Sequence, residues 1–489
     1  MPLYGVCTAA LDQSLRGVSV YPSMAGLATR GYNRVPYRWP NRSPPKIWHN
    51  NCHNLRFPEF VINAPLPSTG ITPDAAYPPA GPPLRIALLG YRSAPFSGGQ
   101  GVYLRYLSQA LQALGHQVTV ISGPPYPDLV AGVTLVKLPS LDLYSRDLWS
   151  VGREELQNRL GRKEWLSKLS GGFAEPWTFG ERARDWLLAN AAQFDVIHDN
   201  QTLAPGILDL QQAGLPVVTT VHHPITRDLR VALVGEPIWW RRLLIRRWHS
   251  FLAMQKQVAS QLNHIVTVSA ASAIDIATDF GVPPSAIRIV PNGVDTSLFR
   301  PLPTVARNPH QIIATASADA PLKGLSVLLH AFHSLCATWP DLRLVLIARP
   351  RSGGDTEALI NRLELSERIR FVSDASHDDI NRLYAESAVA VVPSLYEGFG
   401  LPAVEAMAAG IPLVSSDGGA LSEVVSDGGL QVPAGDSAAL AQGLEAVLSQ
   451  RALASDLAAR GLMRVKTHFC WSVCAEQMVS LYRACIERC

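Results

Sequence analysis

Short apolar runs alternate with longer segments of helical spacing along most of this chain. The first run covers residues 84–90, and Tyr103, Leu107 and Leu111 then recur at the interval of one helix face. Short apolar runs predict buried strands, and the spacing between them predicts helices. Further strands of this kind are expected at 117–121, 196–197, 217–221, 265–268 and 287–290.

A second alternation begins near residue 311. Its expected strands lie at 312–316, 342–347, 369–372, 388–392 and 412–415. The stretch between the two alternations, residues 290–303, is dense in proline and glycine, which marks a domain junction. Alternating strands and helices imply parallel, doubly wound sheets. We therefore expect an α/β protein with two Rossmann-like domains.

Residues 1–80 have a different composition from the rest of the chain. They are rich in Pro, Asn, Arg and Ser, and they show no sustained period of a strand or a helix. A segment without a periodic apolar pattern cannot join a packed core. We expect residues 1–80 to be a disordered, Pro-rich extension.

The segment 397–410 carries the strongest local signal. It follows the expected strand at 388–392, and a glycine-rich loop leads to Pro402, a favoured first helical residue, with Gly410 as a helix stop. A helix that starts this way offers free N–H groups and a positive dipole end to an anion, and glycines allow that anion to approach closely.

Two carboxylates flank this expected anion site. Glu397 opens the segment, and Glu405 lies in the helix that follows. Carboxylates accept hydrogen bonds from hydroxyl groups, so the pattern favours a ligand with both phosphate and sugar hydroxyls, such as a sugar nucleotide. The alternative is a capped helix that carries a surface glutamate.

Two glutamates separated by seven residues around Gly-Phe-Gly-Leu-Pro resemble the donor-site motif of retaining GT-B glycosyltransferases of family 4, also called glycosyltransferase group 1. The resemblance covers residues 84–489 in order and includes Pro-Asn-Gly-Val-Asp at 291–295. It implies that Glu397 organises the donor sugar and that Glu405 holds the ribose hydroxyls. It also implies donor contacts from Gly398, Phe399, Gly400 and Leu401.

The resemblance implies a division of the chain as well. Residues 84–300 would form the first Rossmann-like domain, on the acceptor side, completed by C-terminal helices at 470–489. Residues 307–468 would form the second, which binds the nucleotide-sugar donor. In this GT-B architecture the two domains face each other across a cleft.

Lys323 follows the first expected strand of the second domain and precedes an expected helix at 325–335. In the family, a lysine here binds the donor diphosphate, and a point charge suits that task. The alternative is a solvated lysine at a helix start. Ser317 stands where the family has a second, arginine ligand; Arg349 and Arg351 are candidates to replace that charge.

Two features of the expected first domain match the family. Gly98, Gly99 and Gly101 match the glycine loop of the family's first domain, which lies in the cleft near the donor diphosphate and the acceptor. His222 ends the expected strand at 217–221, and carboxyl ends of strands face the ligand crevice in open α/β sheets. The resemblance implies that His222 contacts the donor sugar; the alternative is a buried histidine in a turn.

Residues 239–248 combine tryptophan, aliphatic residues and arginine. A helix of this composition can lie on an anionic membrane surface, so peripheral membrane contact is one interpretation. The other is an amphipathic helix that packs its apolar side into the domain.

Composition narrows the remaining options. The net charge is only +3, which does not suggest nucleic-acid binding. No apolar window long enough to span a membrane and no signal peptide is visible, and seven scattered cysteines favour a reducing compartment, so we expect a cytoplasmic protein. The chain contains no Asp-x-Asp pair for a divalent ion, and we expect neither a metal nor a cofactor.

The sequence thus predicts a metal-independent hexosyltransferase-type enzyme. It would move a sugar from a nucleotide diphosphate sugar to an acceptor hydroxyl of a sugar, lipid or small molecule, with retention of configuration. Lys323, Glu397 and His222 would carry the chemistry. The alternative, which Ser317 motivates, is a catalytically weak sugar-nucleotide-binding or membrane-associated assembly partner of the same fold.

Overall fold

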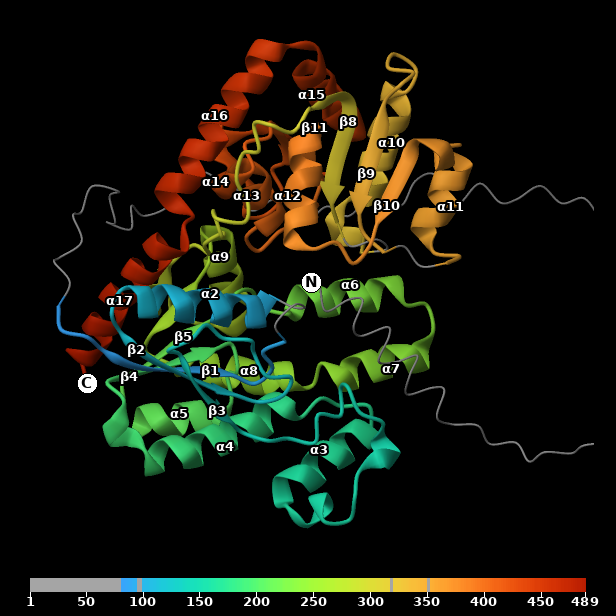
Figure 1. Cartoon of the computed structure of the whole chain (residues 1–489). Helices are drawn as coiled ribbons and strands as arrows, with labels where there is room; N and C mark the ends of the chain where they lie inside the picture. Colours follow the sequence, from blue (N-terminus) through green and yellow to red (C-terminus); the bar gives the residue numbers. More distant parts are fainter. Residues whose placement is uncertain (1–80, 95–98, 317–319, 350–351) are drawn as a thin grey trace, which may run out of the picture. The chain divides into compact units, whose positions relative to one another are not determined.

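The computed structural model describes residues 81–94, 99–316, 320–349 and 352–489 (Figure 1). The expectation for residues 1–80 lies outside this part. Both sheets described below belong to one compact unit that includes residues 82–489. Each sheet is parallel throughout and is covered by helices, so the prediction of an α/β protein with two Rossmann-like domains is confirmed.

The first sheet has the strand order β3-β2-β1-β4-β5-β6-β7. Its strands are β1 (Arg85–Gly90), β2 (Gln117–Ser122), β3 (Thr134–Lys137), β4 (Val196–Asn200), β5 (Val217–Thr220), β6 (Ile265–Thr267) and β7 (Ile287–Ile289). Its helices are α2 (Gly99–Ala113), α3 (Arg159–Leu169), α4 (Glu175–Ala189), α5 (Pro205–Gln212), α6 (Thr226–Gly235), α7 (Trp239–Trp248), α8 (Phe251–Ala259) and α9 (Ala270–Phe280).

The second sheet has the strand order β10-β9-β8-β11-β12-β13. Its strands are β8 (Asn308–Thr315), β9 (Arg343–Ile347), β10 (Ile369–Val372), β11 (Ser387–Val392), β12 (Leu413–Ser416) and β13 (Leu430–Val432). The helices after β8 are α10 (Leu325–Leu335), α11 (Asp355–Arg362), α12 (His377–Glu386), α13 (Leu401–Ala408), α14 (Leu421–Val425), α15 (Ser437–Ser449), α16 (Arg451–His468) and α17 (Trp471–Ile486).

Both faces of the first sheet are buried, which explains its continuous apolar runs. Alternate residues of β1 point to opposite faces: Ile86 and Leu88 pack with α2, and Ala87 and Leu89 pack on the side of α4 and α5. The helix α17 returns from the second sheet and packs against the α2 side. There the Tyr482 hydroxyl lies 2.6 Å from Nδ1 of His198.

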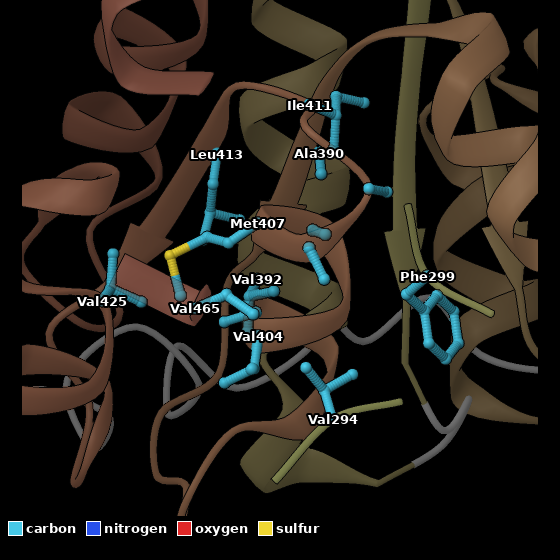
Figure 2. Close-up of a cluster of buried hydrophobic side chains, with 14 of the residues drawn as sticks. Val294, Phe299, Ala390, Val392, Val404, Met407, Ile411, Leu413, Val425 and Val465 are labelled. Carbon is cyan, nitrogen blue, oxygen red and sulfur yellow. The ribbon is translucent and has the colours of Figure 1, made fainter. Parts of the chain in front are cut away.

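The second sheet is built in the same way. Ile312 packs with α10, whereas Ile313 belongs to the core on the opposite face. Figure 2 shows that second core, in which Met407 of α13 lies among Val404, Leu413 and other apolar side chains. Burial of Met407 fixes α13 against the sheet and thereby holds the loop that precedes this helix.

The edge strands β3 and β13 did not emerge from the sequence pattern. Both ends of β3 are exposed, and β13 has only three residues, two of them half-buried. In both strands the exposed and half-buried positions interrupt the apolar run that reveals a buried strand.

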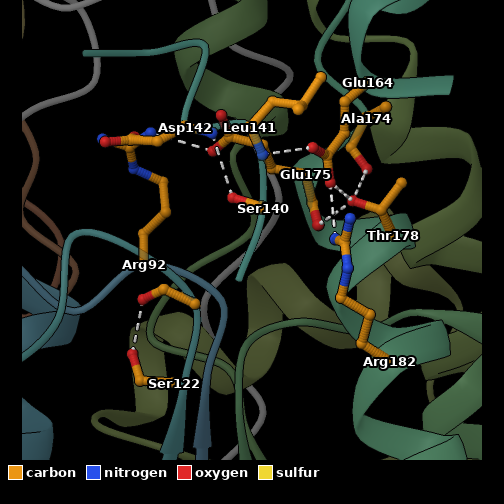
Figure 3. A network of polar contacts seen from close by, with 11 residues as sticks. Arg92, Ser122, Ser140, Leu141, Asp142, Glu164, Ala174, Glu175, Thr178 and Arg182 are labelled. Carbon is orange, nitrogen blue, oxygen red and sulfur yellow. Dashed lines mark hydrogen bonds and ion pairs between the residues drawn. The ribbon is translucent and has the colours of Figure 1, made fainter. Parts of the chain in front are cut away.

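A buried polar network joins α3, α4 and the chain that leaves β1 (Figure 3). Glu164 accepts hydrogen bonds from Thr178 and from Arg182, each at 2.6 Å, and Arg92 lies 2.9 Å from Glu175. Burial raises the pKa of Glu175. Because each carboxylate has a cationic partner, this network anchors the two helices.

Candidate active site

Lys323 and Glu397 come from loops that are far apart in the sequence. The Lys323 Nζ atom lies 2.7 Å from Oε1 of Glu397, and the Ser394 hydroxyl donates to the same oxygen at 2.8 Å. The Glu397 side chain is only 10% exposed and that of Lys323 is 21% exposed. The structure therefore places a partly buried ion pair at the carboxyl end of β11.

A glycine is required where these two loops meet. Gly324, directly after Lys323, has a φ of +64°, and a Cβ at this position would lie 1.9 Å from the carbonyl oxygen of Pro393. Any side chain would push the Lys323 loop away from the segment that carries Glu397. The close approach keeps the ammonium and the carboxylate together.

The loop after Glu397 leads into α13 as the sequence predicts. Gly400 adopts a φ of +96° just before the helix, and a Cβ there would lie 2.6 Å from Leu421. The first-turn N–H groups of an α-helix have no partner within the helix, and Pro402 occupies a position where no N–H is needed. Glu397 and the positive end of α13 thus belong to one short segment.

Phe399 and Leu401 have a different environment from the one expected of ligand contacts. Phe399 is buried in the core, where its ring centroid lies 5.7 Å from that of Phe469. Leu401 is half-buried and packs against the same core. In this structure both side chains pack against the core and anchor the loop, Phe399 fully and Leu401 in part.

Glu405 lies on α13, and within the described part of the chain its carboxylate makes no hydrogen bond or ion pair. Burial raises its pKa to about 7. Burial together with the charges of Asp295 and Glu405 raises the pKa of Tyr106, on α2, to about 12. Glu405 therefore lies close enough to α2 for its charge to act on a residue of the first sheet's helices.

His222 follows β5 and has a defined orientation. Its Nε2 atom lies 2.8 Å from Oδ1 of Asn200, and its ring centroid lies 4.7 Å from that of Tyr103 in an edge contact. Burial lowers the pKa of His222 to about 3, so the ring is neutral. The neighbouring His223 turns instead toward Asp228, with 3.3 Å between Nε2 and Oδ2.

The glycine segment and His222 are connected through Asn200. The side-chain amide of Asn200 donates to the carbonyl oxygen of Gln100 at 3.1 Å. Gly99 begins α2, and Gly101 packs so tightly that a Cβ would lie 2.1 Å from the carbonyl oxygen of Ala94. Gly98 lies outside the described residues.

The loop after Glu397 lies directly against the histidine pair. A Cβ at Gly398 would lie 3.3 Å from Cβ of His223 and 3.7 Å from the carbonyl oxygen of His222. Glycine leaves the backbone of this loop close to the end of β5. The structure thus brings the predicted residues His222, Lys323, Glu397 and Gly398 into one region.

Comparisons with known proteins identify the family to which the chain belongs. The model of Glycosyltransferase Family 4 matches residues 97–298, and that of Glycosyl transferases group 1 matches residues 304–463. The MMP alpha-(1->4)-mannosyltransferase of Mycolicibacterium hassiacum is 46% identical over 412 residues, which is 83% of this chain and 99% of that protein. The chain belongs to glycosyltransferase family 4. It is therefore an enzyme that transfers a sugar from a sugar donor.

Other relatives are more distant. The phosphatidyl-myo-inositol mannosyltransferase of Mycobacterium leprae is 30% identical, over 82% of this chain and 96% of that protein. Sucrose-phosphate synthase from Thermosynechococcus elongatus superposes with a TM-score of 0.63 at 23% identity, covering 83% of this chain and all of that one. The lipopolysaccharide glycosyltransferase WaaG gives a TM-score of 0.59 at 17% identity, over 81% and 99% of the two chains. These two structures show that the family 4 chain has the GT-B fold.

Of the charges that the sequence suggested in place of the family arginine, only Arg349 lies among the described residues. Ser317 and Arg351 lie outside the described residues. Arg349 forms an ion pair with Asp374, and its side chain is 71% exposed. Among the described residues, no group of three or more His, Cys, Asp and Glu side chains is placed to hold a metal ion.

Asn200 and Gln201 were missed by the sequence reasoning. Gln201 has a φ of +57°, and its side-chain amide accepts from the His222 N–H and donates to the His223 carbonyl, each at 2.9 Å. The signal was present as a polar run, His-Asp-Asn-Gln, at the carboxyl end of a strand whose every residue is buried. In parallel sheets such positions face ligands.

Proposed function

We propose that this family 4 glycosyltransferase is a retaining α-mannosyltransferase that uses a nucleotide diphosphate mannose and needs no divalent metal. The Lys323–Glu397 pair beside the start of α13 carries the proposal, because it combines a cation for a diphosphate with a carboxylate for sugar hydroxyls. The mannosyl group is supported by the relative at 46% identity, whose name describes an α-mannosyltransferase.

Each residue has a distinct part in the proposed reaction. The bond between the anomeric carbon and the phosphate oxygen breaks, the acceptor oxygen bonds to that carbon, and the acceptor proton goes to the leaving phosphate. Lys323 and the first N–H groups of α13 stabilise the charge that develops on the phosphate. Glu397 accepts from sugar hydroxyls, and Glu405 accepts from the ribose.

The test uses the full-length chain with a panel of GDP-mannose, UDP-glucose and ADP-glucose. Within this panel we expect GDP-mannose to raise the melting temperature, because a ligand at 100 times its Kd stabilises by about 2.7 kcal/mol. Transfer to mannoside acceptors should give an α-linked product, visible by proton NMR, and should continue in EDTA. A β-linked product, or a loss in EDTA that added cations restore, would contradict the proposal.

Ser317 supports a second candidate, a binding protein of the same fold with little turnover. It supplies no charge at the position where the family has an arginine. The same panel separates the two functions, since a pure binder shows a melting shift with each preferred nucleotide and no product. Product formation at a rate far above the uncatalysed one excludes it.

We also propose that α7 docks on an anionic lipid surface. Trp239 is 72% exposed and Leu243 51% exposed, whereas Ile245 and Trp248 are buried. The helix carries four arginines and no acidic residue, which complements anionic headgroups. The 30% identical relative is named for phosphatidyl-myo-inositol. Among the described helices, none is long and apolar enough to cross a bilayer.

Vesicle sedimentation tests this docking. Binding is expected with phosphatidylcholine vesicles that contain phosphatidylglycerol and not with phosphatidylcholine alone. Trp239→Ser should weaken it several-fold, whereas Trp149→Ser, at a tryptophan that is 69% exposed elsewhere, should not. Equal sedimentation of both variants would remove α7 from the interaction.

A further inference from the structure

The loop before α13 contains Tyr396, Glu397 and Gly398, and these residues contact two different parts of the protein. Glu397 turns toward Lys323 and Ser394. The carbonyl oxygen of Gly398, next in the chain, accepts hydrogen bonds from the hydroxyls of Ser269 at 2.6 Å and Ser272 at 3.0 Å. Ser269 is the N-cap residue of α9, a helix of the first sheet, and Ser272 lies in the first turn of that helix. The loop is thus held from outside its own domain.

Tyr396, on the other side of Glu397, contacts the same helix. Its hydroxyl donates to Asp275 of α9. Arg227 binds the other oxygen of that carboxylate at 2.6 Å, and its guanidinium lies 4.0 Å from the centre of the Tyr396 ring. Asp275 is buried, so both of its oxygens are used inside the protein.

A carboxylate from the second sheet's helices completes the arrangement. The two oxygens of Glu423, on α14, accept from the backbone N–H groups of Ala270 and Ala271, each at 3.0 Å. These are first-turn N–H groups of α9, which have no partner within their helix and favour a negative charge. Glu423 therefore caps α9 from a different domain, while Arg464 holds the backbone of Glu423 at 2.6 Å.

We propose that Ser269, Ser272, Asp275 and Glu423 are positioning residues that fix the loop 396–400 for transfer. With Tyr396 and the Gly398 carbonyl held by α9, the Glu397 side chain stays against Lys323 and the first N–H groups of α13 keep their direction. A loop free to shift by a fraction of an ångström would lose alignment that matters most when charge develops on the leaving group. The inference rests on the proposed transferase function.

Ser272→Ala is the most selective variant. Alanine favours a helix more than serine does, so the change removes the donor to Gly398 without weakening α9 itself. We expect kcat to fall about tenfold, with the KM for the donor changed less than kcat, since about 1.4 kcal/mol of lost alignment corresponds to a factor of ten. Ser108→Ala is the matched control, at a buried helical serine that donates to the Arg105 carbonyl oxygen of its own helix.

Ser269 combines positioning with helix capping, so its variants test the two roles together. It caps α9 by accepting from the Ser272 N–H at 3.0 Å, and it also donates to Gly398. Ser269→Thr keeps both functions and should retain turnover, whereas Ser269→Ala loses both. Glu423→Gln keeps one acceptor but no charge and should lower kcat, while Glu445→Gln, at an exposed glutamate of α15, should not.

A second readout does not depend on turnover. Hydrogen exchange in the peptide that contains residues 396–401 should be faster in Ser272→Ala than in the wild type and in Ser108→Ala, with unchanged melting temperatures. If the wild type transfers no sugar from any donor, the proposed function fails, and exchange still decides whether α9 holds the loop. If the wild type is active while Ser272→Ala and Glu423→Gln match it in kcat and exchange, the positioning role is wrong.

Discussion

The Nε2 atom of His222 lies 2.8 Å from Oδ1 of Asn200, whose amide nitrogen is committed to the carbonyl oxygen of Gln100 at 3.1 Å. The Asn200 oxygen can only accept, so Nε2 of His222 carries the proton and donates it. With the pKa of His222 lowered to about 3 by burial, Nδ1 is left as an acceptor. Asn200 thus decides which hydrogen bond His222 can offer to a ligand hydroxyl.

Asn200→Asp should make His222 titrate in the working range. A carboxylate beside Nε2 favours the imidazolium and raises the pKa of His222, so Nδ1 becomes a donor at low pH. We expect kcat/KM of the variant to fall as the pH drops below neutrality. In the wild type, His222 should cause no such fall. Asn263→Asp, at an exposed asparagine, controls for the added charge; identical pH profiles would contradict the assignment.

The same depressed pKa affects stability. The unfolded histidine, with its ordinary pKa of 6.5, binds a proton at a higher pH than folded His222, whose pKa is about 3. The contribution of neutral His222 to the free energy of unfolding is therefore present above pH 6.5 and is lost as the pH falls toward about 3. His222→Gln should flatten this part of the melting temperature against pH.

Lys323→Ala should lower kcat by two or more powers of ten, on the scale of one lost oxyanion donor. Ser317→Ala should lower it less, because a serine supplies no charge. The Lys323 change also leaves Glu397 partly buried without its cation, so Lys323→Ala with Glu397→Gln should recover stability without recovering turnover. Lys466→Ala, at an exposed lysine of α16, is the control; near-normal kcat in Lys323→Ala would place the diphosphate elsewhere.

Glu405→Ala should weaken donor binding by about 1–3 kcal/mol, as expected when an acceptor for ribose hydroxyls is removed. Isothermal titration at several pH values adds a sharper check. Since the pKa of Glu405 is about 7, donor affinity should rise between pH 6 and 8 as the carboxylate ionises. Without donor, the stability from the protonated group is full below its ordinary pKa of 4.5 and is lost as the pH rises through about 7. Glu405→Gln should abolish the pH dependence of donor affinity and that of stability.

Deletion of residues 1–78 should leave a folded, active enzyme. The segment lacks a periodic apolar pattern, and the relative at 46% identity aligns over 99% of its own length with only 83% of this chain. Melting temperature and turnover of the shortened chain should match those of the full chain. An insoluble product from a soluble parent would show that the extension contributes to the fold.

Local pattern in the sequence was enough to predict the two parallel α/β domains, the central strands and the segment from Glu397 to Gly410. Burial on both faces makes a central strand a continuous apolar run, and a helix start has its own residue preferences, so both are visible within a few residues of sequence. Resemblance to the family implied that Lys323 and Glu397 both serve the donor, but their ion pair, between residues 74 positions apart, came from the structure.

Contacts that the tertiary structure alone decided have no local signature. In the sequence, Ser269 and Ser272 resemble an ordinary helix start, and Glu423 resembles a surface acid. In the structure the two serines bind the active-site loop, and Glu423 binds the first turn of α9, each across more than 120 residues of sequence. For Phe399 the family resemblance implied a ligand contact, and the structure places its side chain in the core. Which polar groups become partners depends on how the two sheets and their helices pack, and that packing is set by the whole chain.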